Sequence, residues 1–546
     1  MLDSAVRVLA RGSIGFDSRS GAGISGEHGS EFQADNPVQV KDFCEMAVQS
    51  LKSNVLFTWL AHLAALVTGF FLMPYVMHVL GDASYGQWVF INSFVAYGGL
   101  LYMGMGETIC RYVAKYHSEG NTKGLNEVVT IVASVYSLGA AFAFLLSVGI
   151  ALLLPWMSPW KGQELLEIQL VVVILGLNLA MSLLGSIFGG VLMGVRRFDL
   201  ERTVGIVFDL VRVALIFVFL HREWGLLTMA LIYMIITILE NSAFMYLSWK
   251  ALPELQIRLS HWKYSVLKEC TSFSSMALLN NFAQSLIYAT DSIVIGFLMG
   301  AEAIVPYYIA LRLVQFIRQP IEKVAFICMP TAGAMQSSAD RGKLHKLFLQ
   351  AIGITFLLAA GINLGAYFFG GDLITLWVGA GYEESHRLLV ILLAATVVTL
   401  PCNLLRSFLL AQGTIRFPAM IYFAEAIANL VISLGLGFML GRVGVAIGTL
   451  VPAVILEAGV LLPFGLSILG ISGWRLMNDA IRPQLVPLAA LAGYCLLISP
   501  QPWAHGSWLA LVGVSAGGGA VLGVAWLLVH NPPGNWWPGL MRRQEA

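Results

Sequence analysis

The sequence has very little charge: 12% of its 546 residues are Asp, Glu, Lys or Arg, whereas 58% are hydrophobic. A soluble domain carries about 25% charged residues, so this mixture cannot supply a surface that faces water. Most of the surface must therefore face lipid, and helices are expected because they satisfy their backbone groups internally. The net charge of +1 argues against a nucleic-acid partner.

Motifs for cofactors and for nucleotide chemistry are also missing. The six cysteines are scattered and form neither a CxxC spacing nor a disulfide framework. There is no HxxxH or HExxH pair, so the sequence predicts no metal centre and no other cofactor. It lacks a GxxxxGK[ST] loop and does not hydrolyse nucleotide by itself. The expected outer loops are too short for the catalytic groups of a glycosyltransferase, so we do not expect an enzyme.

The chain does contain a long series of apolar segments, and about 20 residues are enough to cross a bilayer. A polar stretch rich in Gly and Ser, residues 1–50, precedes them and is expected to form a disordered cytoplasmic tail. We expect fourteen spans, at roughly 54–80, 86–106, 127–155, 168–194, 203–220, 225–249, 272–299, 303–330, 347–369, 387–412, 417–440, 443–469, 480–498 and 507–529.

Lysine and arginine are distributed unevenly between the segments that join these spans. With the N-terminus on the cytoplasmic side, the inner segments contain 23 of them and the outer segments contain four. The positive-inside rule therefore predicts a multi-pass protein of the cytoplasmic (inner) membrane with both termini in the cytoplasm.

An internal repeat connects the two halves of the chain. Because the repeat unit contains six spans, an even number, both copies face the same way and are related by an axis along the membrane normal. We expect an all-α integral membrane protein of two six-helix lobes, 51–250 and 251–470, with a C-terminal helix pair and short tail in 471–546. The repeat rests on landmarks that recur 219 residues apart: Gly81 and Gly300, Gly194 and Gly413, Arg197 and Arg416, Phe198 and Phe417, Gly225 and Gly444.

Charged groups inside the predicted spans indicate the candidate site, because each costs about 2.5–3.5 kcal/mol at a helix centre. In span eight the polar side chains share one arc of about 140°. Three cations and one acid leave this stripe near +2, which favours a lining for an anionic substrate. The alternative is ion pairing with acids on neighbouring helices, with Lys323 reaching the inner interface. The stripe consists of Arg312, Gln315, Arg318, Gln319, Glu322 and Lys323.

Span seven has a polar face that contains one acid, Asp291, together with Asn280, Gln284 and Tyr288. Asp291 is either a proton or cation site or the salt-bridge partner of an arginine in span eight. The candidate substrate-binding residues are Arg312, Gln315, Arg318, Gln284 and Asn280, and the candidate ion-coupling residue is Asp291.

Other intramembrane charges give weaker signals. Asp209 and Arg212 are three residues apart and are predicted to pair on one helix. Arg406 lies in the inner third of span ten and is expected to reach the interface. Three single acids either sit near an interface or form hydrogen bonds across helices: Glu240, Glu425 and Glu457.

Several segments resemble a known family. Spans one and two read FLMPYVMHVLGDASYGQW, span four ends in GVLMGVRRFDLE, and YATDSIVIGFLMGAEAIVPYYIALRL joins spans seven and eight. From about residue 51 to about residue 470, the chain resembles the O-antigen and capsule type of polysaccharide flippase, in the multidrug/oligosaccharidyl-lipid/polysaccharide exporter superfamily. The first span has no arginine, unlike the signature of lipid II flippases, and this departure argues against a peptidoglycan role.

The resemblance implies two six-helix lobes around a central cavity that opens to each side in turn. Helices one, two, seven and eight line that cavity in the family, and Arg312, Gln315, Arg318 and Asp291 fall on matching helices. The implied substrate is a polyprenyl-pyrophosphate-linked oligosaccharide, flipped across the cytoplasmic membrane for O-antigen, capsule or exopolysaccharide biosynthesis. Membrane lipids are implied partners, and polymerase and export components are compatible ones. The alternative is an ion-coupled multidrug or organic-cation exporter of the same superfamily.

Overall fold

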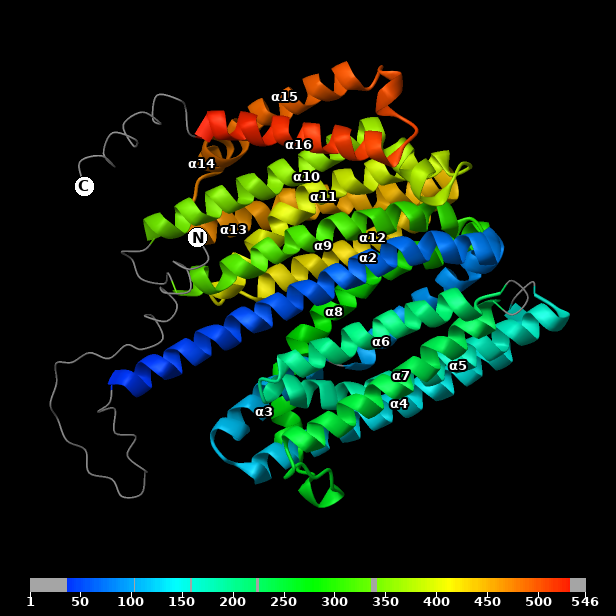
Figure 1. Ribbon diagram of the computed structural model, residues 1–546, viewed down its shortest axis with the longest axis vertical. Coiled ribbons are helices and arrows are strands. Elements are labelled where there is room, and N and C mark those ends of the chain that lie inside the picture. Colours follow the sequence, from blue (N-terminus) through cyan, green and yellow to red (C-terminus); the bar gives the residue numbers. More distant parts are fainter. Residues whose placement is uncertain (1–36, 103, 158–159, 222–224, 335–340, 531–546) are drawn as a thin grey trace.

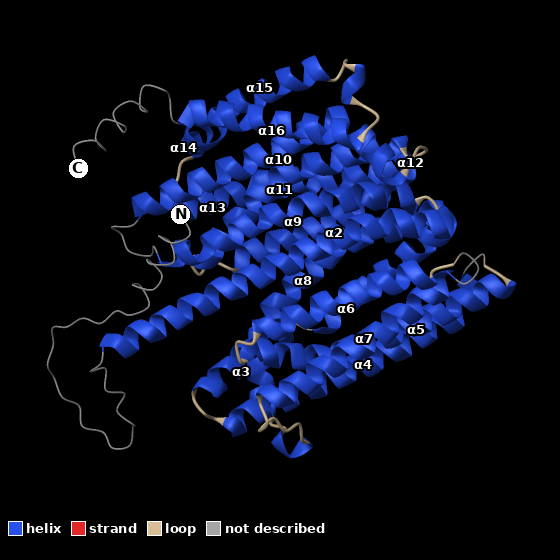
Figure 2. Ribbon diagram, viewed as in Figure 1, coloured by secondary structure: helices blue, strands red, loops and turns tan. Residues whose placement is uncertain are grey.

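The computed structural model describes residues 37–530 except 103, 158–159, 222–224 and 335–340, and this part consists of helices without a strand (Figures 1 and 2). The long helices are α2 (Pro37–Tyr97), α4 (Thr122–Met157), α5 (Gly162–Gly194), α6 (Phe198–Phe219), α7 (Gly225–Ala251), α8 (Tyr264–Met299), α9 (Ile304–Ala334), α10 (Arg341–Val378), α11 (Glu383–Ala411), α12 (Arg416–Pro452), α15 (Arg482–Ile498) and α16 (Trp508–His530). Shorter elements are α3 (Met105–Ser118), α13 (Leu462–Leu469), α14 (Gly473–Leu476), the π-helices η4 (Ala453–Leu461) and η5 (Met477–Ile481), and the 3-10 helices η1 (Gly98–Tyr102), η2 (Leu259–His261) and η6 (Pro502–Ala504).

The expected all-α membrane architecture is confirmed. Ten helical segments of the described residues are long and apolar enough to cross a membrane. Two of these segments each contain two predicted spans, because the backbone leaves helical geometry at Gly81 in α2 and at Gly441 in α12. The two other predicted spans are α6 and α9, which carry several charged side chains and so fall outside the apolar ten.

Two predicted boundaries differ from the structure. Span two was expected to reach residue 106, but α2 ends at Tyr97 and η1 follows. Gly104, with a φ of 66°, then redirects the chain into α3, a conformation that glycine adopts at little cost. The boundary expected at residue 50 also differs, because α2 begins at Pro37; residues 1–36, where the rest of the expected tail falls, lie outside the described part.

The repeat recurs in the backbone geometry of its two copies. Gly81 has φ 75° and ψ 166°, and Gly300 has φ 89° and ψ 163°. Each glycine therefore makes the same non-helical break between the first two spans of its copy of the repeat. Residues that carry a Cβ avoid these backbone dihedral angles. A Cβ at Gly86 would overlap the carbonyl group of Ala301. The missing side chain thus lets the turn of one copy contact the turn of the other.

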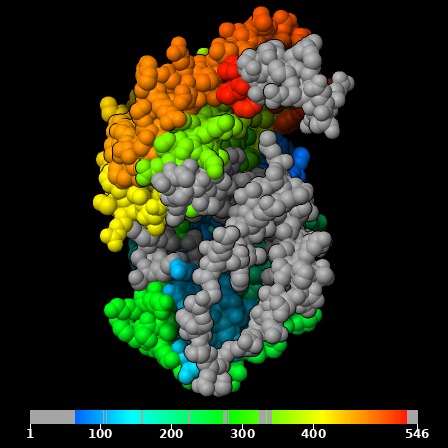
Figure 3. Space-filling model, turned by 90° about the vertical axis from the view of Figure 1, so that its left-hand side faces the viewer, coloured from blue at the N-terminus to red at the C-terminus, as the bar shows by residue number. Residues whose placement is uncertain are grey.

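The helices form two groups, with α2 and α8 between them. In Figure 1, α3–α7 lie on one side, which we call the N-lobe, and α9–α13 lie on the other, which we call the C-lobe. We call the end of the bundle where α2 begins and α16 ends the tail side, and the other end the far side. Figure 3 looks at the tail side, with the C-lobe above and the N-lobe below.

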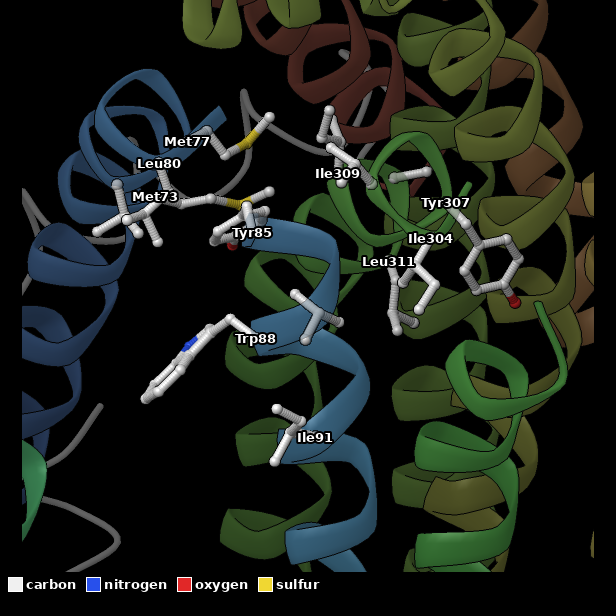
Figure 4. Packing of buried hydrophobic residues seen from close by; sticks show 14 of the residues in the cluster. Met73, Met77, Leu80, Tyr85, Trp88, Ile91, Ile304, Tyr307, Ile309 and Leu311 are labelled. Carbon is white, nitrogen blue, oxygen red and sulfur yellow. The ribbon is translucent and has the colours of Figure 1, made fainter. Parts of the chain in front are cut away.

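The buried apolar core is continuous at the far side and divided at the tail side. One shared cluster includes Met73 and Trp88 of α2, Ile216 of α6, Ile304 of α9 and Leu388 of α11. Figure 4 shows part of it, with both arms of α2 next to the first turns of α9. In each of the helices α5 to α11, the residues that belong to this shared cluster lie near the end of the helix at the far side. The tail-side ends instead belong to two separate clusters, one in each lobe.

Polar contacts reinforce the junction between α2 and the C-lobe. The Tyr382 hydroxyl donates a hydrogen bond of 2.5 Å to Asp82 Oδ1, next to the break at Gly81. The Trp377 indole N–H donates a bond of 2.7 Å to the carbonyl of Phe70, and the two rings stack at 5.1 Å. The first helix is therefore fixed to α10 and to the turn that follows it.

The helix pair α15–α16 packs on the outside of α10. Phe369 of α10 shares a small apolar cluster with Leu491 and Leu511 of the pair. The loop between α15 and α16 adds a polar contact, since His505 Nδ1 lies 2.6 Å from Asp372 Oδ2 and its Nε2 lies 2.8 Å from the Ser499 carbonyl oxygen. The hydrogen bond to the Ser499 carbonyl, followed by the bond to Asp372, raises the pKa of His505.

This contact predicts a pH-dependent stability. Because folding raises the pKa of His505, its contribution is fully present below the ordinary histidine pKa of about 6.5 and is lost as the pH rises through the raised value. We expect His505→Gln to remove this part of the pH dependence of the melting temperature, measured on detergent-purified protein. His530→Gln on the exposed end of α16 is the control. An unchanged pH profile in His505→Gln would contradict the assignment.

Candidate functional site

A cavity of about 110 Å³ lies in the C-lobe, bordered by α8, α9, α11, α12 and η4. A small cavity lined by both signs of charge is unusual inside a membrane protein, where ionised groups are expensive and mark functional positions. Its ionisable lining residues include Asp291, Arg318, Glu322, Arg406, Glu425 and Glu457.

Arg318, a predicted substrate-binding residue, lines this cavity. Its guanidinium carbon lies 3.9 Å from the ring centroid of Tyr288, and its Nε lies 3.2 Å from Glu322 Oε1. Gln284, another predicted substrate-binding residue, lines the same cavity. Arg318 thus has an acidic partner one turn away on its own helix, and not on a neighbouring helix as the ion-pairing alternative expected.

Arg312 faces a different space, between the lobes. Its Nη1 donates a hydrogen bond of 3.0 Å to Gln315 Oε1, and its guanidinium carbon lies 5.4 Å from the ring centroid of Phe316. A Cβ at Gly69 of α2 would lie only 3.4 Å from its Nη2. Within the described residues no acid pairs with Arg312. The predicted stripe is therefore divided, with Arg312 and Gln315 towards α2 and Arg318 towards the C-lobe cavity.

Asp291 is buried, with 2% exposure, and is surrounded by hydroxyl groups. It accepts hydrogen bonds from Tyr307 at 2.5 Å, from Thr449 at 3.0 Å and from Ser433 at 3.4 Å. In the described part of the chain it forms no ion pair with either Arg312 or Arg318, so that alternative is not found. The Asn280 side chain lies outside the described residues, as does that of Lys323.

Sequence reasoning missed the hydroxyl groups around Asp291. A signal was available on α12, where Asn429 and Ser433 are four residues apart and share one face of the helix. Asn429 Nδ2 donates to Thr449 Oγ1 at 3.1 Å, and Asn429 Oδ1 has no hydrogen-bond partner. Together these groups place several oxygen atoms around one buried carboxylate, and none of the described groups that bond to it is a cation.

The N-lobe has its own charged cluster. The predicted Asp209–Arg212 pair is confirmed, at 2.7 Å between Oδ1 and Nη1. Arg212 also lies 3.6 Å from Glu240 Oε2 and 5.1 Å from the ring centroid of Tyr233. Glu240 therefore interacts across helices, which is one of its two predicted alternatives. Arg212 therefore has two acidic partners, in contrast to Arg312.

The prediction that Arg406 reaches the interface was wrong. Its Nη1 lies 2.5 Å from Glu457 Oε1, and its guanidinium carbon lies 4.6 Å from the ring centroid of Tyr422. Glu457 is fully buried in the π-helix η4. A charged partner inside the C-lobe removes the reason for Arg406 to extend to the interface. Glu425, at 4% exposure, lines the same cavity.

The two arginines of α9 should respond differently to neutralisation. Arg318→Gln leaves Glu322 without its cation and should lower the free energy of unfolding by about 1–3 kcal/mol. Arg312→Gln breaks no ion pair and should keep the membrane abundance and melting temperature of the unmodified protein. Adding Glu322→Gln to Arg318→Gln should restore part of the loss. Equal destabilisation by both single substitutions would contradict the division of the stripe.

Comparisons with known proteins agree with this architecture. Residues 121–387 match a family model described as polysaccharide biosynthesis protein. No curated protein sequence matches the chain. Among solved structures, lipid II flippase MurJ in an inward closed conformation is similar, with a TM-score of 0.67 and 12% identity, covering 87% of this chain and 97% of that chain.

Two further structures are transporters. An inward-facing multidrug resistance MATE family transporter of the MOP superfamily has a TM-score of 0.64 and 16% identity, covering 75% of this chain and 94% of that one. A MOP superfamily transporter from Pyrococcus furiosus, described as having a binding pocket of reversed polarity, has a TM-score of 0.51 and 16% identity, covering 76% and 93%. The predicted resemblance is thus confirmed: the chain has the fold of the multidrug/oligosaccharidyl-lipid/polysaccharide exporter superfamily, and its middle part matches a polysaccharide biosynthesis family.

Proposed function

We propose that this protein flips a polyprenyl-pyrophosphate-linked oligosaccharide across the cytoplasmic membrane by alternating access, for polysaccharide biosynthesis. The observation that carries the proposal is Arg312, an arginine between the lobes to which no acid within the described residues is paired. A pyrophosphate that leaves water needs charge-assisted donors. A guanidinium remains charged and binds phosphate oxygens in a bidentate manner. The match to a polysaccharide biosynthesis family supports the substrate class.

The division of the core supports the transport cycle. The shared cluster joins the lobes at the far side, while separate clusters fill each lobe at the tail side. If the tail side is cytoplasmic, as the distribution of Lys and Arg predicts, this state is closed towards the outside. The headgroup would then enter from the inner leaflet, with its prenyl chain left in the lipid.

The second candidate function is export of drugs or organic cations. A specific observation favours it, since the C-lobe cavity is lined by four acids and only two arginines. Such a balance suits a cationic substrate better than a pyrophosphate. Arg312 lies outside that cavity lining, so the two functions depend on different spaces in the molecule and can be separated by substitution.

Substitution of Arg312 tests the flippase proposal. Loss of one hydrogen bond to a charged group costs about 1.5–3 kcal/mol, so Arg312→Gln should weaken headgroup binding by roughly tenfold to over a hundredfold. Arg312→Lys should retain part of the activity, because it keeps the charge but loses the bidentate fork. The measurement is surface glycan and accumulated lipid-linked glycan per molecule of transporter in a deletion strain.

The control for this test is Arg387→Gln, which removes an exposed arginine at the start of α11. Normal glycan export from an abundant Arg312→Gln variant would exclude the proposed role of the residue. A deletion strain without any glycan defect, but with increased drug sensitivity, would favour the second candidate function.

Asp291 is proposed to bind the cation that drives transport. Its carboxylate and the surrounding hydroxyl oxygens are hard ligands of the kind that alkali and alkaline-earth ions prefer. In proteoliposomes, Asp291→Asn should lose the dependence of transport on a cation gradient, whereas Asp479→Asn, at an exposed surface pair, should retain it. Normal transport with unchanged cation dependence in Asp291→Asn would exclude this role.

A further inference from the structure

A second group of acids lines the C-lobe cavity, and the proposed function does not use it. Glu425 of α12 is 4% exposed and Glu457 of η4 is fully buried. The Oε2 atom of each has no hydrogen-bond partner within the described residues. The two carboxyl groups lie within hydrogen-bonding reach of each other. Buried polar atoms that lack a partner are rare and call for an explanation.

The local charges do not balance if both acids are ionised. Arg406 forms its ion pair with Glu457, and the other cavity arginine, Arg318, pairs with Glu322. No cation lies within ion-pair distance of Glu425 in the described part of the chain. Two carboxylates and a single guanidinium would leave one negative charge in an apolar interior, at a cost of several kcal/mol.

The remaining neighbours do not supply the missing positive charge. The ring of Tyr422 of α12 contacts the Arg406 guanidinium, and Cys402 of α11 is buried beside both acids. From α8, Asp291 and Tyr288 face the same cavity. These groups are neutral or acidic, so a bound ligand must compensate the extra carboxylate.

We propose that Glu425 and Glu457 form a proton-binding site, in which the two carboxyl groups share one proton beside Arg406. Two carboxyl groups in contact cannot both ionise in a low-dielectric environment, so one of them keeps its proton. The protonated Glu425 would donate its O–H to Glu457, while Glu457 accepts from Arg406. The shared proton would then join the two carboxyl groups whose Oε2 atoms otherwise have no hydrogen-bond partner. The trio of side chains, Glu425, Glu457 and Arg406, would have no net charge.

A proton suits this site better than a metal ion. The Arg406 guanidinium already contacts Glu457 at 2.5 Å, and its positive charge repels a second cation. The hydroxyl-rich surroundings of Asp291 contain no such arginine. The cavity therefore has two chemically distinct sites, one for a metal cation and one for a proton.

Proton release would be coupled to a change of conformation. The proton comes from water and returns to water, and no bond of the substrate is made or broken. Its departure changes the trio from neutral to a net charge of −1, which a closed cavity does not tolerate. Glu457 lies in a π-helix directly after Pro452, which ends α12. Such wide turns occur frequently at functional sites and offer a local segment that can rearrange.

Infrared difference spectroscopy on the full-length protein in nanodiscs tests the proposal without substrate, so the result does not depend on the transport assignment. Spectra are recorded between about pH 5 and about pH 10, a range in which ordinary solvated carboxyl groups are already ionised. We expect a protonated-carboxyl band that disappears at high pH. Glu425→Gln and Glu457→Gln should each lose the band, whereas Glu383→Gln on the exposed start of α11 and Asp291→Asn should retain it.

Melting temperatures of the same samples separate proton binding from a purely structural role. Each single Gln variant leaves one carboxylate for Arg406 and should remain folded, whereas the double variant leaves Arg406 unpaired and should be unstable. A band retained in both single variants, or lost in Asp291→Asn, would overturn the proposal. The unmodified protein is decisive by itself, since the absence of any titrating buried carboxyl group would also overturn it.

Discussion

The free energy needed to bury an ionised side chain is the constraint on which the arrangement of these helices depends. In the described part of the chain, three sets of contacts neutralise most of the central charges: Arg212 with Asp209 and Glu240, Arg318 with Glu322, and Arg406 with Glu457. Three groups remain without an opposite charge, namely Arg312, Asp291 and Glu425. Since a chain with so few charges retains these three in its interior, we assign them to the substrate headgroup, to a cation and to a proton.

The positions of these groups follow from the packing of the two repeats. The shared apolar cluster joins the lobes at the far side and leaves separate cores at the tail side. Glycine makes this junction possible, because Gly86 lets the turn of one repeat contact the turn of the other at Ala301. Arg312 therefore lies between the lobes, where a change in their relative position would alter its surroundings. Asp291, Glu425 and Glu457 instead line the C-lobe cavity and can bind ions without movement of the N-lobe.

Sequence determines an interaction most directly when both residues lie on one helix, and least when the partner lies on another helix. The Asp209–Arg212 pair was predictable because residues three apart lie on one face of a helix. The partner of Arg406 was not, because Glu457 is 51 residues away and its direction depends on a π-helix. The hydroxyl groups around Asp291 come from α9 and α12, and spacing within α8 contains no information about them.

The sequence by itself determined that this is a helical membrane protein with a duplicated bundle. Hydropathy and the spacing of glycines are local properties, and lipid permits few structures other than helices for segments of this kind. The tertiary structure decided which acid meets which arginine, and that the polar stripe of α9 divides between the interlobe space and the C-lobe cavity. The physical reason is that the rotation of each helix about its axis is set by packing against segments distant in sequence. That rotation decides whether a charged side chain meets a partner, a cavity or lipid.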